Sequence, residues 1–311
     1  MAIFQPGLVH APVTPFKRDH SIDFDTYAKI LEFHLRNGAD ALALPMPEGE
    51  DMSLTDAEQR KVLEFAIARV KGRVPVIAHV SDAGTSIAVE RAIHAEKAGA
   101  SAIVSHPPYF WHPKPSMVTE HLVSIGTAVK LPFFIMNPPI ESVGTTLSTD
   151  IVLQVIERVP NLAGVVDASL DFVFMEELVF GARQLRPDFQ LIAGADFVVS
   201  ACALGGSGVF SPLSGIAPRL VRGLYDLCRK EQFIEAREMQ ENIGALNHAV
   251  KSAGESGLRD GLAGLKAAHS AFGRECGMPR PPVRSLGEIE HSRLSELIAG
   301  MTFLEAEPRG W

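Results

Sequence analysis

Hydrophobic residues recur along most of the chain as short, continuously apolar runs separated by longer amphipathic segments. Most of these runs lack the alternation of a half-exposed strand, which is typical of parallel strands covered on both faces. There are eight of them, at residues 7–13, 40–45, 74–80, 101–107, 131–137, 162–168, 189–195 and 207–213. The pattern therefore predicts a parallel β-sheet.

The segments between these runs carry helix signals. Residues 24–38 place apolar side chains three and four positions apart and end at Gly38, where a helix commonly stops. Thr55, followed three residues later by Glu58, forms a capping box at the start of another helix. Eight strand–helix units in about 225 residues predict a TIM barrel, with a doubly wound sheet as the alternative. In a barrel, the chemistry belongs at the C-terminal ends of the strands.

The last part of the chain shows no strand pattern. Three segments there are helical by spacing, and a Pro-rich connector at 279–286 precedes the last of them. We expect a (β/α)8 barrel over residues 1–231 and a helical extension packed on it over residues 232–311. The apolar faces of these helices could also form an oligomer interface.

Composition narrows the choice of partners. With 311 residues, 46% of them hydrophobic, the chain can bury a large core. A net charge of −8 argues against nucleic acid or an anionic membrane as partner and favours a small-molecule substrate. No signal segment and no run of about 18 apolar residues is present, so we expect a cytoplasmic protein that does not span a membrane. The three cysteines are widely spaced, which suits free thiols. No cofactor is expected.

Taken in order, the strand-end sequences resemble the dihydrodipicolinate synthase / N-acetylneuraminate lyase family along nearly the whole chain. The resemblance rests on the order and spacing of VTPF (13–16), LTDAEQRKV (54–62), HPPYF (106–110), LPFFIMNPP (131–139), AGVVDAS (163–169), AGAD (193–196) and GGSGVFS (205–211). It implies a TIM barrel, a homo-oligomer (dimer or tetramer) and class I aldolase chemistry. In that chemistry, a lysine on the sixth strand forms an imine with a 2-oxo acid such as pyruvate.

Several positions depart from this family pattern. Val166 stands where the resemblance implies the imine-forming lysine, and none of the eight apolar runs contains a lysine. Met136 replaces the tyrosine of the family's Y-N-x-P motif, and Phe110, after Tyr109, replaces a second tyrosine of the synthases. Glu141 corresponds to the synthase arginine. The resemblance therefore implies a divergent member that works without an imine.

The loop at residues 46–50 departs as well. It reads MPEGE, whereas the family's G-T-T-G-E grips a substrate carboxylate with hydroxyls and backbone N–H groups. Pro47 has no N–H to donate. An ionised Glu48 about 4 Å from a substrate carboxylate would repel it by on the order of 4 kcal/mol at an effective dielectric near 20, or about a thousandfold in affinity. We expect the pocket to prefer a neutral or cationic group, a metal, or another substrate orientation.

Glu48 and His106 are the predicted catalytic residues. A carboxylate at the barrel mouth can act as a general acid or base, although a solvated loop acid is an equal alternative. His79 and His106 end adjacent strands and, with Glu48 and His10, could form a metal site. No HxH or ExxH spacing supports such a site, so hydrogen-bonded rim histidines are the preferred interpretation, and no metal ligand is predicted.

The remaining assignments concern the lining of the pocket and the residues beside it. Strand alternation predicts that Asp167 faces the helical layer and bonds locally. We expect Glu50 to tie its loop to the following helix. The predicted substrate-binding residues are Pro47, Gly49, His79, Tyr109, Met136, Asn137, Val166, Asp196 and Ser211.

Two functional hypotheses follow. The first is a lyase that breaks C–C or C–O bonds in a small oxo-acid or sugar-derived substrate by acid/base or metal-assisted chemistry, without an imine. The second is a non-catalytic binding or regulatory protein on a degenerate aldolase barrel.

Overall fold

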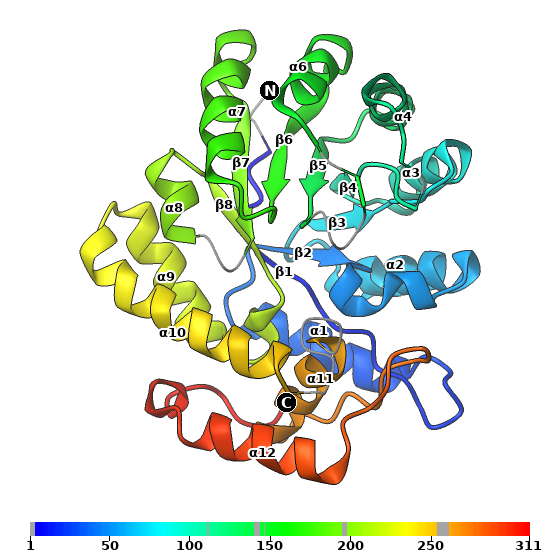
Figure 1. The fold of residues 1–311 in the computed structure, drawn as a ribbon. Coiled ribbons are helices and arrows are strands. Elements are labelled where there is room, and N and C mark those ends of the chain that lie inside the picture. Colours follow the sequence, from blue (N-terminus) through cyan, green and yellow to red (C-terminus); the bar gives the residue numbers. More distant parts are fainter. Residues whose placement is uncertain (1–3, 111, 140–143, 146, 195–197, 254–260) are drawn as a thin grey trace.

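The structure is a computed structural model, and it describes residues 4–110, 112–139, 144–145, 147–194, 198–253 and 261–311. Eight parallel strands close into a barrel in which each strand pairs with the next and β8 pairs with β1 (Figure 1). Each predicted apolar run contains one strand. The strands are β1 (Leu8–His10), β2 (Ala41–Leu44), β3 (Val76–His79), β4 (Ala102–Ser105), β5 (Phe133–Asn137), β6 (Leu162–Asp167), β7 (Gln190–Gly194) and β8 (Gly208–Ser211). The predicted TIM barrel is confirmed.

Helices surround this barrel and connect its strands (Figure 1). They are α1 (Phe24–Arg36), α2 (Asp56–Val70), α3 (Thr85–Ala98), α4 (Pro115–Thr127), α6 (Thr149–Arg158), α7 (Phe172–Leu185), α8 (Val198–Ala203) and α9 (Pro218–Arg229). The predicted capping box opens α2: the Thr55 hydroxyl accepts from the Glu58 N–H, and the Glu58 carboxylate accepts from the Thr55 N–H. No helix among the described residues has the length and apolar character that crossing a membrane requires.

Strand alternation divides the apolar residues into two clusters. Inside the barrel, Phe134, Val166 and Ile192 pack together with the inward-facing residues of the other strands. Their sequence neighbours, such as Phe133 and Val165, face outward and pack against the helices. Two packed layers therefore hold each strand, which fixes which side chains reach the barrel mouth.

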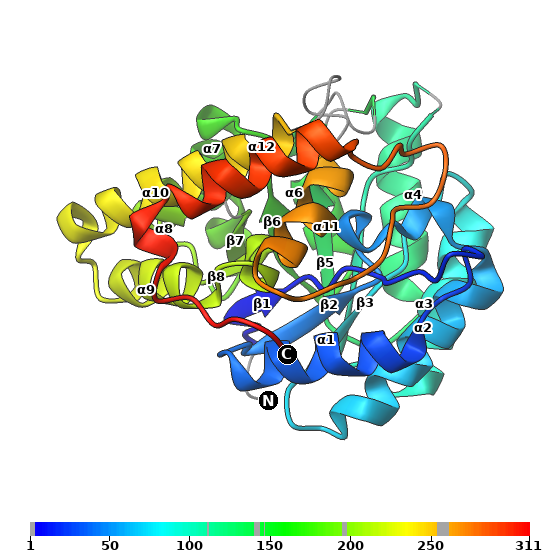
Figure 2. The same ribbon diagram turned by 90° about the horizontal axis from the view of Figure 1, so that it is seen from below.

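Three further helices follow the barrel, as the sequence predicts. They are α10 (Phe233–Lys251), α11 (Gly261–Ala271) and α12 (Glu288–Ala299). Helix α10 packs against α9 and α11, and α12 packs against α10 and α11. Figure 2 shows α12 running alongside α10 on the outside of the molecule. The helical extension is thus attached to the barrel through the α9–α10 contact, through hydrogen bonds of Arg274 and Glu307 to residues 215–220 and through the loop described next.

A buried ion pair joins the extension to the loop after β2. Lys266 Nζ of α11 lies 2.5 Å from Glu50 Oε1, and the side chains are 2% and 0% exposed. The Arg280 N–H donates to Glu50 Oε2 (2.7 Å), and the Arg280 guanidinium reaches Glu58 of α2. The expectation that Glu50 ties its loop to the following helix is therefore corrected. Glu50 binds the extension, because the nearest cation to its carboxylate comes from α11, and Arg280 carries the link on to α2.

Breaking this pair on one side should destabilise the fold. In Lys266→Met, Glu50 stays buried without its counter-charge, and we expect a loss of about 3–5 kcal/mol in the free energy of unfolding. The double variant Lys266→Met with Glu50→Gln should recover part of that loss. Urea unfolding of both proteins measures the difference.

The matched control is Arg158→Met, which removes an exposed ion pair with Glu120 and should cost less than about 1 kcal/mol. Equal losses of unfolding free energy in Lys266→Met and Arg158→Met would show that the buried pair stabilises the fold no more than an exposed pair does.

Candidate functional site

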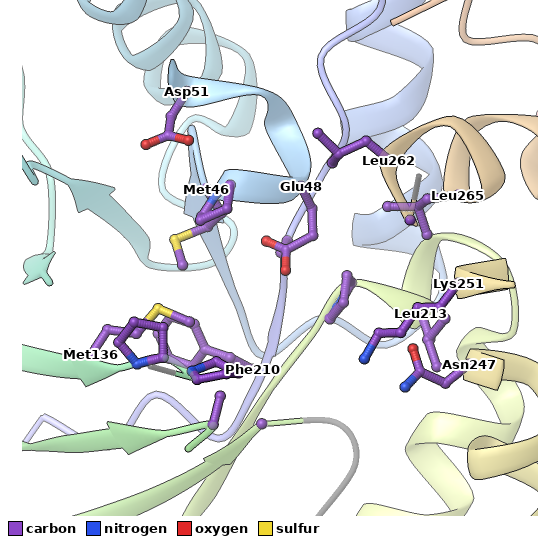
Figure 3. Close-up of a pocket in the computed structure, with 18 of the residues that line it drawn as sticks. Met46, Glu48, Asp51, Met136, Phe210, Leu213, Asn247, Lys251, Leu262 and Leu265 are labelled. Atoms are coloured by element: carbon purple, nitrogen blue, oxygen red, sulfur yellow. The ribbon is translucent and has the colours of Figure 1, made fainter. Parts of the chain in front are cut away.

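A cavity of about 600 Å3 opens at the C-terminal ends of the strands. Met136, Ala168, Gly194 and Phe210, from four successive strands or their ends, line its barrel side. The loop after β2 contributes residues on one side, and α10 and α11 contribute residues on another (Figure 3). The size is typical of small-molecule sites. This is where a TIM barrel places its chemistry.

The loop after β2 aims two carboxylates at this cavity. It consists of two single turns, η1 (Pro47–Gly49) and η2 (Asp51–Ser53), joined at Glu50, whose φ of 59° is left-handed. Glu48 extends from the first turn into the cavity (Figure 3). Asp51, on the second turn, also lines the cavity but is only 4% exposed. Two acids with different environments therefore stand on one short loop.

A chain of buried polar groups runs behind Asp51. Asp51 Oδ2 lies 3.3 Å from His79 Nδ1, and Ser81 Oγ lies 2.7 Å from His79 Nε2. The backbone N–H of His106 donates to Ser81 Oγ (2.7 Å). The His79 ring also donates a hydrogen bond to the backbone carbonyl of Pro45. Ser81 and Pro45 thus orient the His79 ring, which lies directly beside the Asp51 carboxyl group.

Burial sets the protonation states of this cluster. It raises the pKa of Asp51 to about 7, and the nearby Glu48 charge adds to the effect. Burial lowers the pKa of His106 to about 4 and that of His79 well below its ordinary value. Near neutral pH the two histidines are uncharged, and Asp51 is divided between its acid and its carboxylate.

Two buried atoms of the cluster lack a hydrogen-bond partner in the part of the chain that the structure describes. His106 also lines the cavity, and its ring packs edge to face with that of His79, with 4.9 Å between centroids. Asp51 Oδ1 and His106 Nε2 are buried and have no hydrogen-bond partner within the described residues. Buried polar atoms are normally paired. Both atoms are fully buried, so a ligand in the cavity reaches them only after a neighbouring side chain moves.

The arrangement does not resemble a metal site. In the described part of the chain, no group of three or more His, Cys, Asp or Glu side chains could hold a metal ion. Both ring nitrogens of His79 already have partners in Asp51 and Ser81. His10 lies on the other side of its strand, 3.0 Å from His34 between the Nδ1 atoms. The metal-site alternative therefore finds no support in the geometry.

Comparison with known proteins agrees with the barrel. A model of the dihydrodipicolinate synthetase family matches residues 5–300. The chain belongs to this family. It is a lyase family, and the chain is 34% identical to a 4-hydroxy-tetrahydrodipicolinate synthase of Rhodopseudomonas palustris (strain BisA53), over 82% of this chain and 85% of that one.

Longer matches extend the likeness over nearly the whole chain. The synthase of Bartonella tribocorum (strain CIP 105476 / IBS 506) is 30% identical, with 96% of this chain and 99% of that one covered. Among solved structures, the dihydrodipicolinate synthase from Aquifex aeolicus superposes with a TM-score of 0.86 at 26% identity, over 95% of this chain and 97% of that one. The extension after the barrel is thus covered by the family match as well.

Within this family fold, five of the predicted site residues line the cavity. Glu48 and His106, the predicted catalytic pair, lie there together with Pro47, Tyr109 and Met136. Burial raises the pKa of Tyr109 to about 12, and the charges of Asp82 and Asp51 add to the rise. The structure brings these residues together from the ends of β2, β4 and β5.

The other predicted lining residues lie elsewhere. Gly49 faces Pro12, so that a Cβ there would stand 3.1 Å from the Pro12 oxygen. His79 lies behind Asp51, and Val166 is packed inside the barrel. Asn137 and Ser211 face outward: Asn137 Nδ2 donates to Asp167 Oδ1 (2.8 Å), and Ser211 Oγ accepts from the Ser214 N–H. Alternation along each strand turns these two side chains away from the cavity.

Two further predictions concern acids beside these strands. Asp167 is bonded locally, as expected, because its Oδ1 also accepts from Ser169 Oγ (2.9 Å). Burial raises the pKa of Asp167 to about 6, but the residue lies outside the cavity lining. Asp196 and Glu141 lie outside the described residues.

Sequence reasoning missed several lining residues. Asp51 is the most consequential, and its signal was its place one residue after Glu50, in a loop already singled out. Asn247 and Lys251 were also missed. They occur in an amphipathic helix far along the chain, and only the packing of α10 brings them to the cavity.

The buried Asp51 should leave a signature in stability. Its pKa is raised from 3.8 to about 7, so the folded state binds the proton more tightly than the unfolded state does. The stability that this proton contributes is complete at low pH and is lost as pH rises through about 7. We expect wild type to lose roughly 2–3 kcal/mol relative to Asp51→Asn between pH 5 and pH 7.

Urea unfolding of both proteins at a series of pH values measures this difference, and comparison with Asp51→Asn removes the common contribution of the histidines. A stability difference between the two proteins that stays constant from pH 5 to pH 7 would contradict the raised pKa of Asp51.

Proposed function

We propose that the protein is a lyase that cleaves a C–C or C–O bond of a small oxo-acid or sugar-derived substrate by acid/base chemistry, without an imine on the enzyme. The observation that carries the proposal is the pair of unlike carboxyl groups on the loop after β2. Glu48 projects into the cavity, and Asp51 is buried against His79 with a pKa of about 7. Such a split environment assigns acid and base roles to paired carboxyls.

Support for the imine-free route comes from the barrel interior. None of the eight strands, all of which the structure describes, contains a lysine. Val166, on β6, faces the interior of the barrel, next to Met136 and Ile192 on the paired strands. By resemblance to the family, this is the place of the imine-forming lysine. Electron withdrawal must then come from a hydrogen-bond donor rather than from a covalent bond.

For C–C cleavage, Glu48 takes the proton of a hydroxyl group β to the substrate carbonyl. The C–C bond breaks, the hydroxyl carbon becomes a new carbonyl, and the electron pair moves onto the other fragment as an enolate. The carboxyl group of Asp51 donates its proton to the enolate oxygen in a hydrogen bond, as a neutral acid in an apolar site can. Glu48 then returns its proton to carbon. His79 acts as a positioning residue through Asp51 Oδ2.

For C–O cleavage, the same groups act on different atoms. Glu48 takes the proton on the carbon next to the carbonyl, and the hydroxyl leaves from the adjacent carbon with a proton from Asp51, as water. The neutral His106 ring lies beside both paths and accepts or donates a hydrogen bond to the substrate. The predicted small-molecule substrate, homo-oligomeric state and cytoplasmic location belong to this same proposal.

The proposal predicts how activity responds to substitution. A library of 4-hydroxy-2-oxo acids, 3-deoxy-2-oxo sugar acids and sugar acids, with products identified by mass spectrometry, provides the assay. Glu48→Gln should lower kcat by about 10²–10⁴. Wild-type activity should fall above about pH 7, as Asp51 loses its proton. For C–C cleavage, Asp51→Asn keeps a hydrogen-bond donor at every pH and should abolish that fall; for C–O cleavage, in which Asp51 gives up its proton, Asp51→Asn should abolish activity.

Asp167→Asn is the matched control, because Asp167 also has a raised pKa but lies outside the cavity; it should leave the pH profile unchanged. Ligand binding without turnover in the whole library would favour the non-catalytic alternative.

A trapping experiment tests the imine separately. Wild type incubated with pyruvate and borohydride should keep its intact mass, because reduction traps only a covalent imine. A stable adduct, located by peptide mapping, would overturn the imine-free route whatever the outcome of the activity assay.

A further inference from the structure

Acidic side chains line one side of the cavity, and a lysine lines another. Glu48 and Asp51 come from the loop after β2, whereas Asn247 and Lys251 come from α10. Figure 3 shows the Glu48 carboxylate and the Lys251 amine entering the cavity from different directions. Most of the surface between them is apolar and comprises Met46, Met136, Phe210, Leu213, Leu262 and Leu265.

We propose that the cavity binds a carboxylate substrate with its acid group at Asn247 and Lys251, and with a neutral or cationic donor, a hydroxyl or amino group, at Glu48. This inference rests on the proposed function and names its substrate class. The orientation is reversed with respect to the one that the family resemblance implies, in which the loop after β2 grips the carboxylate.

Charge decides the orientation. Lys251 is the only lysine or arginine among the described residues that line the cavity. An anionic group of a ligand is therefore attracted most strongly to the side of Lys251. On the other side, an ionised Glu48 about 4 Å from a carboxylate repels it strongly. The same carboxylate of Glu48 is a good acceptor for a hydroxyl or ammonium donor.

The geometry of α10 suits Asn247 and Lys251 to binding a carboxylate together. Asn247 and Lys251 are four residues apart on α10 (Phe233–Lys251), which places them on one helix face, one turn apart. The amide and the ammonium are both donors. They can therefore hold the two oxygens of one carboxylate together.

The volume sets the size of the ligand. About 600 Å3 corresponds to roughly twenty waters at their volume in the liquid. A three-carbon oxo acid would leave most of that space to solvent, whereas an apolar segment between the two polar ends would cover Phe210, Leu213 and Leu262. The substrate class is thus an elongated oxo carboxylic acid that has an apolar middle and carries a hydroxyl or amino group at the end away from the carboxylate.

Binding to the full-length protein tests this directly. The probes are 6-hydroxyhexanoate, 6-aminohexanoate, 4-hydroxyphenylacetate and 4-(aminomethyl)benzoate, each paired with its methyl ester, and calorimetry measures the affinities. For wild type, we expect at least one acid to bind about tenfold or more tightly than its ester. Lys251→Gln should remove that preference, and Lys251→Arg should keep it.

Lys230→Gln, at the exposed C-terminal end of α9, makes the same change in net charge away from the cavity and should bind as wild type does. If no acid binds better than its ester, or if Lys251→Gln keeps the preference, the orientation is overturned. Lys251-dependent acid binding without turnover of any substrate would defeat the proposed function alone. Turnover with no dependence of acid binding on Lys251 would defeat this inference alone.

Discussion

The ion pair between Glu50 and Lys266 is the contact on which the site depends. Turns η1 and η2 have three residues each, and segments that short have no stability of their own. Their position is set by outside contacts. Glu50 binds Lys266 and Arg280 of the extension, and Gln59 of α2 donates to the Asp51 carbonyl. The positions of Glu48 and Asp51 therefore depend in part on residues that follow the barrel in sequence. The helical extension is part of the site.

The environment of each acid, rather than its type, decides what it can do. Asp51 and Asp167 both have a pKa raised by burial, and each has one buried oxygen without a partner within the described residues. Asp167 faces the helical layer, where Asn137 and Ser169 donate to its other oxygen. Asp51 faces the cavity and is held from behind by His79. A raised pKa thus becomes a functional signal only together with access to a ligand.

The sequence predicted the barrel well because the signals for its elements are local. Each apolar run became one strand, and the Thr55–Glu58 capping box formed as its spacing indicated. Glu48 and His106 followed from their place at strand ends. Motif resemblance grouped Asn137 and Ser211 with the pocket although alternation turns them outward. Lys251 could not be predicted, because it reaches the cavity only through the long-range packing of α10.

Under the proposed imine-free function, the departures that the family resemblance implies at Val166 and Glu48 are consistent with each other. An imine-forming lysine is useful only if the neighbouring loop holds the carboxylate of its oxo-acid partner, and Glu48 repels that group. Conversely, an amine at position 166 would be surrounded by Met136, Ile192 and the other apolar residues of the barrel interior, where its charged form is costly. Restoring only the lysine at position 166, or only a carboxylate-binding loop after β2, would therefore not restore imine chemistry, because that chemistry needs both. A substrate bound as we propose, held by α10 and acted on by the loop after β2, would need neither an imine-forming lysine nor a carboxylate-binding loop after β2.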